Sequence, residues 1–344
     1  MKPRIGVLLG DPNGIGPELA VKLLAVEEVR ARADIVVIGD EHVFRAGEKI
    51  ARVSVPIAVT GDIAEASFGA GETVFLDMKA IEAHEVTPGE ATAAGGRSAY
   101  ESLKAAIALA KSGAIDGFCF APLNKHALKL GGSPHADEHV LFAELLGHTG
   151  AYCEHNVLCD PKGDPRGDLW TVRVTSHIPL ADVASQVTTE RILAITRLAR
   201  DTLTGAGIEA PRIAVCALNP HAGDGGMFGR EEIDVIAPAV ALAKADGIAA
   251  DGPYPADTIF RRARDGAWDA VVTMYHDQGQ IAMKLMGFER GITVSGGLPV
   301  PIATPASGTA FDITGQGIGN AEGLRQAFEM VCRMAETRRA AAGT

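Results

Sequence analysis

Short apolar, β-branched runs alternate with amphipathic stretches along most of this chain. The runs typical of strands are RIGVLLG, DIVVIGD, ETVFLDM, GFCFAPL, HNVLC, WTVRVTS, RIAVCAL, DAVVTMY and GITVSG. The stretches 96–111, 189–206, 231–246 and 320–338 have the apolar spacing of helices, and Pro17 suits the first turn of another helix that runs to about Glu28. Strands that alternate with helices predict an α/β protein with mostly parallel sheets.

Length and composition limit the class of protein further. A chain of 344 residues suits two lobes of roughly 150 residues each. Hydrophobic residues make up 47% and charged residues 22%, as in soluble globular proteins. No run approaches the ~18 apolar residues of a membrane span, and MKPRIGVLLGDP is not a signal peptide. We therefore expect no membrane partner.

The net charge and the cysteines limit the partners and the cellular compartment that we expect for this protein. A formal charge of −11 without a basic cluster argues against nucleic acid as a partner. The five cysteines are odd in number and scattered, which favours reduced thiols in the cytoplasm over a disulfide framework.

Three histidines each follow one of the predicted strands. They are His177 in WTVRVTSHIPL, His221 in RIAVCALNPHAGDGG and His276 in DAVVTMYHDQG. Open α/β sheets place their chemistry at the carboxyl ends of strands, so the three imidazoles suggest one assembled metal site. Three protein ligands leave coordination positions open for a substrate. A single histidine after a strand is more often a hydrogen-bonded surface residue, so the hypothesis depends on the set. The candidate ions are Zn, Co, Ni, Mn or Mg.

Two glycine-rich segments are candidates for cofactor binding. In the first, Gly14 and Gly16 stand between a strand and a helix, where backbone N–H groups can meet a ligand. The second segment could cradle a ribose and a pyrophosphate, and its candidates are Gly308, Thr309, Asp312, Gly315 and Asn320. Plain structural turns are an equally good interpretation of each segment alone. Neither has the GxGxxG spacing of a dinucleotide fingerprint.

Three further residues are candidate catalytic groups. Asp257 in YPADTIF and Asp277 beside His276 could take a proton near a metal. Lys284 could bind an anionic substrate group or relay a proton. Alternatively, Asp257 is a helix N-cap and Lys284 is a solvated helix lysine.

Six blocks of the sequence, in order, resemble the 4-hydroxythreonine-4-phosphate dehydrogenase family. They are GDPNGIGPE, SHIPL, LNPHAGDGG, GPYPADTIF, YHDQGQIAMK and SGTAFDITGQG. The two glycine-rich segments are also similar to those of isocitrate and isopropylmalate dehydrogenases. This resemblance implies a two-lobed α/β fold with a cleft between the lobes. We expect a cofactor-side lobe at 1–125 plus 300–344, and a metal, substrate and dimerisation lobe at 126–299.

The resemblance also implies an activity. NAD or NADP would accept hydride from a secondary alcohol of a small-molecule substrate, and the β-keto acid formed would lose CO2. The three histidines would be the ligands of one divalent metal ion, one of them donated across the interface of a homodimer. Asp257, Asp277 and Lys284 match active-site positions of the family.

Departures from the family pattern concern the substrate. Where the family has Gly-His-Thr-Glu, a gapless count gives Glu138 and His139 within Asp137–Val140, whereas anchoring on His135 needs a gap. The Asn and Arg that bind phosphate in the family correspond to Thr293 and Ile302. An apolar side chain cannot replace the bidentate fork of an arginine. The candidate substrate-binding residues are His135, Glu138, His139, Lys284, Thr293 and Ile302.

We therefore hypothesise a family paralogue whose substrate lacks the phosphate. Its substrate would be a hydroxy acid, or a carboxylated cis-dihydrodiol of the kind that a related branch oxidises. Phosphorylated 4-hydroxythreonine stays an alternative. A three-histidine metallohydrolase is a different enzyme class that would not need the glycine-rich segments, and a non-catalytic metal-binding protein would not need the acids and Lys284.

Overall fold

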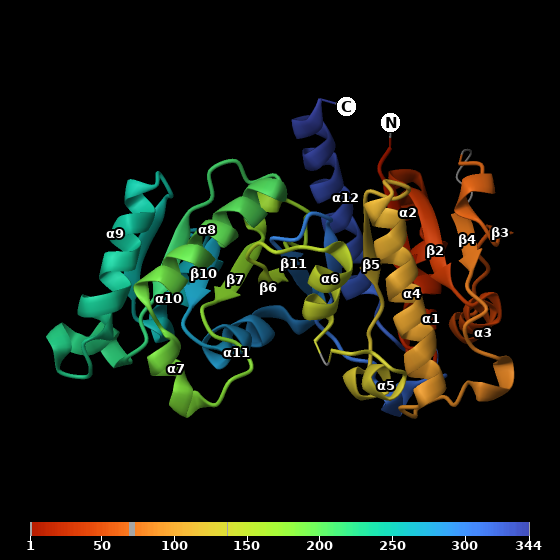
Figure 1. Ribbon diagram of the computed structural model, residues 1–344, viewed down its shortest axis with the longest axis horizontal. Coiled ribbons are helices and arrows are strands. Elements are labelled where there is room, and N and C mark those ends of the chain that lie inside the picture. The colour runs from red at the N-terminus through yellow and green to blue at the C-terminus, as the bar shows by residue number, and fades with distance from the viewer. Residues whose placement is uncertain (1, 69–72, 136, 344) are drawn as a thin grey trace. The chain divides into compact units, whose positions relative to one another are not determined.

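The computed structural model describes residues 2–68, 73–135 and 137–343. Its chain divides into two compact units, Met1–Thr149 with Leu298–Thr344, and Gly150–Gly297 (Figure 1). The sequence placed residues 126–149 in the second lobe. They pack within the first unit instead, because Leu141 and Phe142 lie in its hydrophobic core.

The first unit contains a sheet of parallel strands in the order β3-β4-β2-β1-β5-β12. The strands are β1 (Arg4–Leu8), β2 (Asp34–Gly39), β3 (Ile57–Thr60), β4 (Thr73–Asp77), β5 (Gly117–Phe120) and β12 (Ile302–Pro305). Val7 of β1 pairs with Val37 on one side and Cys119 on the other, and all three are fully buried. Burial on both faces explains why the central strands β1, β2 and β5 have continuous apolar sequences, whereas the edge strand β3 is partly exposed.

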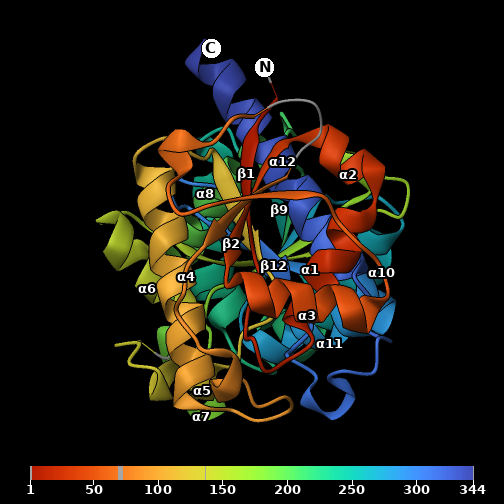
Figure 2. The same ribbon diagram turned by 90° about the vertical axis from the view of Figure 1, so that its right-hand side faces the viewer.

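Helices cover both faces of this sheet. They are α1 (Gly16–Ala25), α2 (Glu27–Arg32), α3 (Glu41–Ala51), α4 (Ala93–Lys111), α5 (Lys125–Leu130), α6 (Glu138–Leu146) and α12 (Glu322–Ala342). Figure 2 shows α4 and α1 on opposite sides of β1 and β2. On the α4 side, Phe142 of α6 packs edge-on against Phe118 and Phe120 of β5, with ring centroids 5.9 and 5.8 Å apart.

The second unit has strands in the order β11-β6-β7-β10-β8-β9. They are β6 (Cys153–Leu158), β7 (Leu169–Arg173), β8 (Ile213–Cys216), β9 (Ala250–Tyr254), β10 (Ala270–Thr273) and β11 (Gly291–Gly296). β6 runs antiparallel to β11 and β7, whereas β7, β10, β8 and β9 are mutually parallel. The carboxyl ends of β7, β8 and β10 therefore meet at one edge of the sheet.

The helices of this unit are α7 (Leu180–Gln186), α8 (Thr189–Gly205), α9 (Ala237–Ala245), α10 (Ala256–Arg264) and α11 (His276–Gly287), with a π-helix at Glu232–Ile236 before α9. Ile259 and Phe260 of α10 and Met283 of α11 pack with strand residues in one core cluster. α11 begins directly after β10, which carries its first residue, His276, to the edge where the parallel strands end.

The predicted α/β class with mostly parallel sheets is confirmed, and each predicted strand is present. The five cysteines are free thiols. Among the residues described, no helix combines the length and the apolar character that crossing a membrane requires.

Candidate active site

The three predicted metal histidines follow the three parallel strands β7, β8 and β10 of the second unit. The imidazole rings of His177 and His276 lie with their centroids 5.7 Å apart. Both line a pocket of about 320 Å³, together with Ser176, Tyr275 and Asp277. In the described residues, the ring nitrogens of all three histidines do not come within 4.8 Å of one another. One chain therefore brings two of them together.

Two of these histidines have a left-handed backbone. His177 has a φ of 49° and His221 a φ of 54°. In L-residues this conformation costs roughly 1–2 kcal/mol. Such strain persists where surrounding structure enforces it, and it gathers at functional sites.

His276 has a neighbour that fixes its orientation. Its Nδ1 lies 2.7 Å from Oδ1 of Asp277, while the histidine side chain stays 40% exposed. A carboxylate on one ring nitrogen orients the other toward a metal, as is usual for metal-bound histidines. Neutral imidazoles suit Zn, Co, Ni or Mn, whereas Mg prefers oxygen ligands, so the donor set fits the first four better.

The candidate catalytic residues lie on two helices. Asp277 and Lys284 are both exposed and stand seven residues apart on α11, which puts them on the same helix face. Asp257 is exposed in the first turn of α10, after the N-cap residue Pro255. It is thus not the N-cap itself, and the helix dipole favours its charge at this position.

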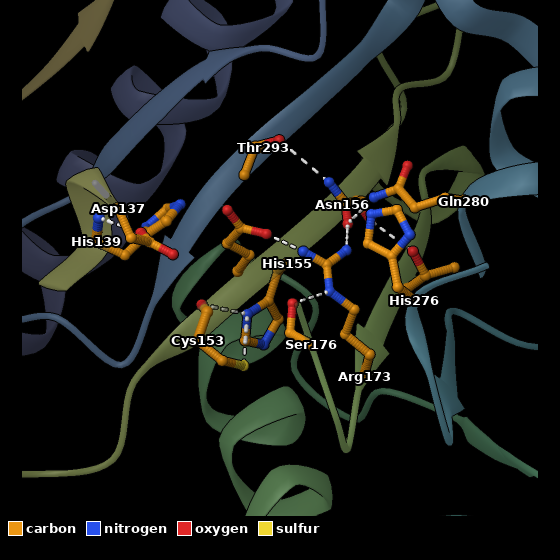
Figure 3. A network of polar contacts seen from close by, with 12 residues as sticks. Asp137, His139, Cys153, His155, Asn156, Arg173, Ser176, His276, Gln280 and Thr293 are labelled. Carbon is orange, nitrogen blue, oxygen red and sulfur yellow. Dashed lines mark hydrogen bonds and ion pairs between the residues drawn. The ribbon is translucent and has the colours of Figure 1, made fainter. Parts of the chain in front are cut away.

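A largely buried polar network lies beside His276 (Figure 3). The guanidinium of Arg173 forms an ion pair with Glu154 and donates to Asn156 Oδ1 at 2.6 Å and to Ser176 Oγ at 2.9 Å. Asn156 also donates to Thr293 Oγ1 at 3.1 Å. Thr293, a predicted substrate-binding residue, is therefore part of this network.

The sequence did not identify the other members of the network. Arg173 is 6% exposed, and its charge stands inside the otherwise apolar run WTVRV. A charged side chain within an apolar strand needs a partner when it is buried. The arginine in WTVRV was therefore the sequence feature that could have identified this network. Gln280 of α11 completes the network by donating to Asn156 Oδ1 at 2.7 Å.

The remaining predicted substrate residues lie in the first unit. Near the start of α6, Glu138 lies 3.3 Å from Lys125, and His139 is buried against Phe142. The Nε2 of His135, before α6, is hydrogen-bonded to the carboxylate of Glu144 in that helix. The expectation for Ile302 is wrong: it is fully buried in β12 and packs in the hydrophobic core, where no substrate reaches its side chain.

The two glycine-rich segments meet in the first unit. The N–H of Ile15 donates to the carbonyl of Thr309 at 3.1 Å, and the N–H of Gly319 donates to Glu18 Oε1 at 2.7 Å. A pocket of about 290 Å³ lies beside them and is lined by residues that include Gly14 and Gly315. The predicted cofactor segments thus share one pocket.

Other members of the predicted cofactor set have structural roles or stay open to solvent. A Cβ on Gly16 would stand 2.2 Å from the carbonyl oxygen of Leu9, so close packing requires this glycine. Asn320 Oδ1 accepts the N–H of Glu322 at the start of α12. Gly308 and Asp312 are exposed.

Two buried residues of the first loop were not among the candidates. Asn13 donates to the carbonyl of Glu90 and to Thr92, and it accepts the N–H of Thr87, which joins two loops. Asp11 is 1% exposed, and burial raises the pKa of its carboxyl to about 6, although a hydrogen bond from the Asn13 N–H opposes the shift. The sequence feature that could have identified Asp11 and Asn13 is their place as polar residues within the glycine-rich loop GDPNGIG.

Parallel strands that end in glycine-rich loops and polar clusters place the chain among the α/β enzymes. The family described as pyridoxal phosphate biosynthetic protein PdxA matches residues 31–331. The chain therefore belongs to the PdxA family.

Individual relatives agree with this assignment. The chain is 52% identical to "Putative 4-hydroxythreonine-4-phosphate dehydrogenase 2" of Pseudomonas aeruginosa, covering 96% of this chain and 97% of that protein. It is 39% identical to D-threonate 4-phosphate dehydrogenase of Cupriavidus necator, with 97% and 98% covered. Because its relatives are named dehydrogenases, the chain is a PdxA-like oxidoreductase.

Solved structures are similar over nearly the whole chain. The 4-hydroxythreonine-4-phosphate dehydrogenase of Klebsiella pneumoniae has a TM-score of 0.83 at 36% identity, covering 97% of this chain and 98% of that one. A terephthalate 1,2-cis-dihydrodiol dehydrogenase of Burkholderia xenovorans has a TM-score of 0.64 at 26% identity, with 96% and 98% covered.

Proposed function

We propose that this chain is a divalent-metal-dependent NAD(P) dehydrogenase that oxidises a secondary alcohol next to a carboxylated carbon, with loss of CO2. The observation that carries the proposal is the delivery of His177, His221 and His276 to the ends of three parallel strands. The metallohydrolase alternative is set aside because the chain belongs to a family of proteins named dehydrogenases.

The three histidines would hold the metal ion. When bound, such an ion acts as a Lewis acid on an oxygen of the substrate. Asp277 holds the ring of His276 in place. Lys284, on the same face of α11, supplies a positive charge for an anionic substrate group, and Asp257 is the candidate acceptor for the hydroxyl proton.

The nicotinamide cofactor would bind at the first unit. Its pocket is bordered by Gly14 and Gly315, and the N-terminus of α1 at Gly16 offers N–H groups to a phosphate. Nothing in these loops selects NAD over NADP, so both are proposed acceptors.

A homodimer would complete the metal site. Ile281, Leu285 and Phe288 form an apolar stripe on and directly after α11, and they are 59%, 83% and 46% exposed. Large apolar side chains gathered on one exposed surface are typical of interfaces. The stripe follows His276 on the same helix, so a second subunit seated there would lie near the histidines.

The proposed substrate is a phosphorylated four-carbon hydroxy acid, since relatives that are 52% and 39% identical are named after 4-hydroxythreonine-4-phosphate and D-threonate 4-phosphate. A second candidate is an unphosphorylated hydroxy acid or a carboxylated cis-dihydrodiol. It is favoured by the engagement of the guanidinium of Arg173 with Ser176, Asn156 and Glu154, which occupies this charge within the protein.

Initial rates of NAD and NADP reduction test the proposal. Each phosphorylated acid is compared with its dephosphorylated form, before and after metal removal by a chelator and after metal is restored. We expect faster turnover of a phosphorylated acid, lost on chelation and regained with Zn, Co, Ni or Mn. Turnover of unphosphorylated acids or dihydrodiols alone would support the second candidate. Undiminished turnover after complete metal removal would refute the metal-dependent mechanism.

A further inference from the structure

The loop that carries His221 has an unusual backbone. Every residue from His221 to Gly226 has a positive φ. Three of the six are not glycine, and each of these pays roughly 1–2 kcal/mol for the left-handed conformation. Such a loop keeps its shape only if its neighbours hold it.

Glu232 holds the loop from one side. Its Oε1 accepts the N–H of Leu218 at 2.9 Å and the N–H of Asn219 at 2.7 Å. Its Oε2 accepts from the side-chain amide of Asn219 at 3.0 Å. Burial favours the protonated acid, but the hydrogen bonds from Asn219 and Leu218 outweigh it, so the pKa of Glu232 lies below its usual range. The carboxylate is thus charged, 3% exposed, and engaged on both oxygens.

Glu232 also leaves no space for a side chain at Gly223, further along the same loop. A Cβ on Gly223 would stand 2.7 Å from Glu232 Oε2. Glu232 is the first residue of the π-helix Glu232–Ile236. Single π-helical turns are rare and are frequent at functional sites. The irregular helix and the left-handed loop therefore meet at one carboxylate.

Gln278 holds the residue directly before this segment, at the end of β8. Its amide nitrogen donates to the carbonyl of Ala217 at 2.9 Å, at the end of β8. Its amide oxygen accepts the N–H of Met274 at 2.8 Å, at the end of β10. One side chain thus ties the strand end before His221 to the strand end before His276.

We propose that Glu232 and Gln278 form a clamp of positioning residues that fixes the loop of His221 at the end of β8. Glu232 fixes residues 218 and 219, two and three positions before His221, while Gln278 fixes residue 217 to the strand that delivers His276. The inference rests on the proposed metal site and adds to it the residues that preorganise one of its ligands, His221.

Metal affinity of the full-length protein tests the clamp. Glu232→Gln keeps the size of the side chain but places an N–H2 group against N–H donors. Gln278→Glu keeps the acceptor for Met274 and loses the donor to Ala217. Asp269→Asn is the matched control, because Asp269 is equally buried and accepts the N–H of Arg212 at the opposite ends of β8 and β10. Dissociation constants for Zn and Co are measured by chelator competition, together with the Co absorption spectrum.

We expect both clamp variants to bind metal about 10- to 100-fold more weakly than the wild type and to show an altered Co spectrum. Asp269→Asn should lose stability yet keep its metal affinity and its spectrum. Wild-type affinity and spectrum in Glu232→Gln and Gln278→Glu would overturn the clamp alone. Equal affinity of the wild type and of His221→Ala would overturn the proposed metal site, and the clamp with it.

Discussion

At the scale of single residues, a buried polar group such as the carboxyl of Asp11 leads to a specific prediction about stability. Asp11 lies in the loop after β1 at 1% exposure, and its Oδ1 accepts the N–H of Asn13 at 2.9 Å. Within the described part of the chain, its Oδ2 has no hydrogen-bond partner. A carboxylate held this way is costly to charge, which is the reason for its raised pKa.

The expected consequence is a pH-dependent stability. The folded state holds the proton of Asp11 up to about pH 6, whereas the pKa of an ordinary aspartate carboxyl is 3.8. This group's contribution to the free energy of unfolding should therefore fall as pH rises from 3.8 to about 6, and stay constant above. The fall is on the order of 3 kcal/mol.

Asp11→Asn removes this titration and keeps the acceptor for Asn13. Relative to the wild type, the variant should gain unfolding free energy between pH 4 and pH 6, as measured by denaturant titration at several pH values. A stability difference that does not change with pH would contradict the assigned cause.

The sequence predicted the positions of the histidines better than their conformations. A histidine after an apolar run indicates a strand end, and all three lie there. Left-handed φ values at His177 and His221 depend on long-range contacts, which local sequence does not encode. Ile302 was misassigned because a gapless count says nothing about which residues of β12 face the core.

At the scale of elements, apolar runs predicted strands well when both faces of the strand are buried. The missed strands are short or irregular, and they include β12 (Ile302–Pro305), which has only four residues although all of them are buried. β3 (Ile57–Thr60) is a half-exposed edge strand, and β9 (Ala250–Tyr254) contains Gly252 and Pro253. The expected helix at 231–246 divides into the π-helix Glu232–Ile236 and α9, a change of hydrogen-bond pattern that apolar spacing does not predict.

The exposed stripe on α11 leads to a prediction about assembly. Leu285→Glu places a charge on the residue that is 83% exposed at the centre of the stripe. We expect the variant to shift from dimer to monomer in sedimentation velocity, because a buried interface does not tolerate an unpaired charge. Leu242→Glu on α9, where the leucine is 47% exposed, is the matched control and should stay dimeric. A Leu285→Glu protein that remains dimeric would place the interface elsewhere.

At the scale of the whole molecule, each unit contributes one part of the proposed chemistry. The first unit carries the glycine-rich pocket, and the second carries the histidines and the Arg173 network. The resemblance to a dehydrogenase family was readable from short motifs and is confirmed by the match over residues 31–331. The boundary between the two units near Thr149 could not be predicted from the sequence, because no stretch with the composition of a linker marks it.

The central claim is that His177, His221 and His276 act together as the metal site of a dehydrogenase. It is tested most directly by bound metal per chain and NAD(P) turnover in the three single alanine variants, with His84→Ala as the control, since His84 belongs to a short helical turn of the first unit. We expect each of the three variants to lose both metal and turnover, and His84→Ala to keep both. Full metal content and wild-type turnover in any of the three would contradict the claim.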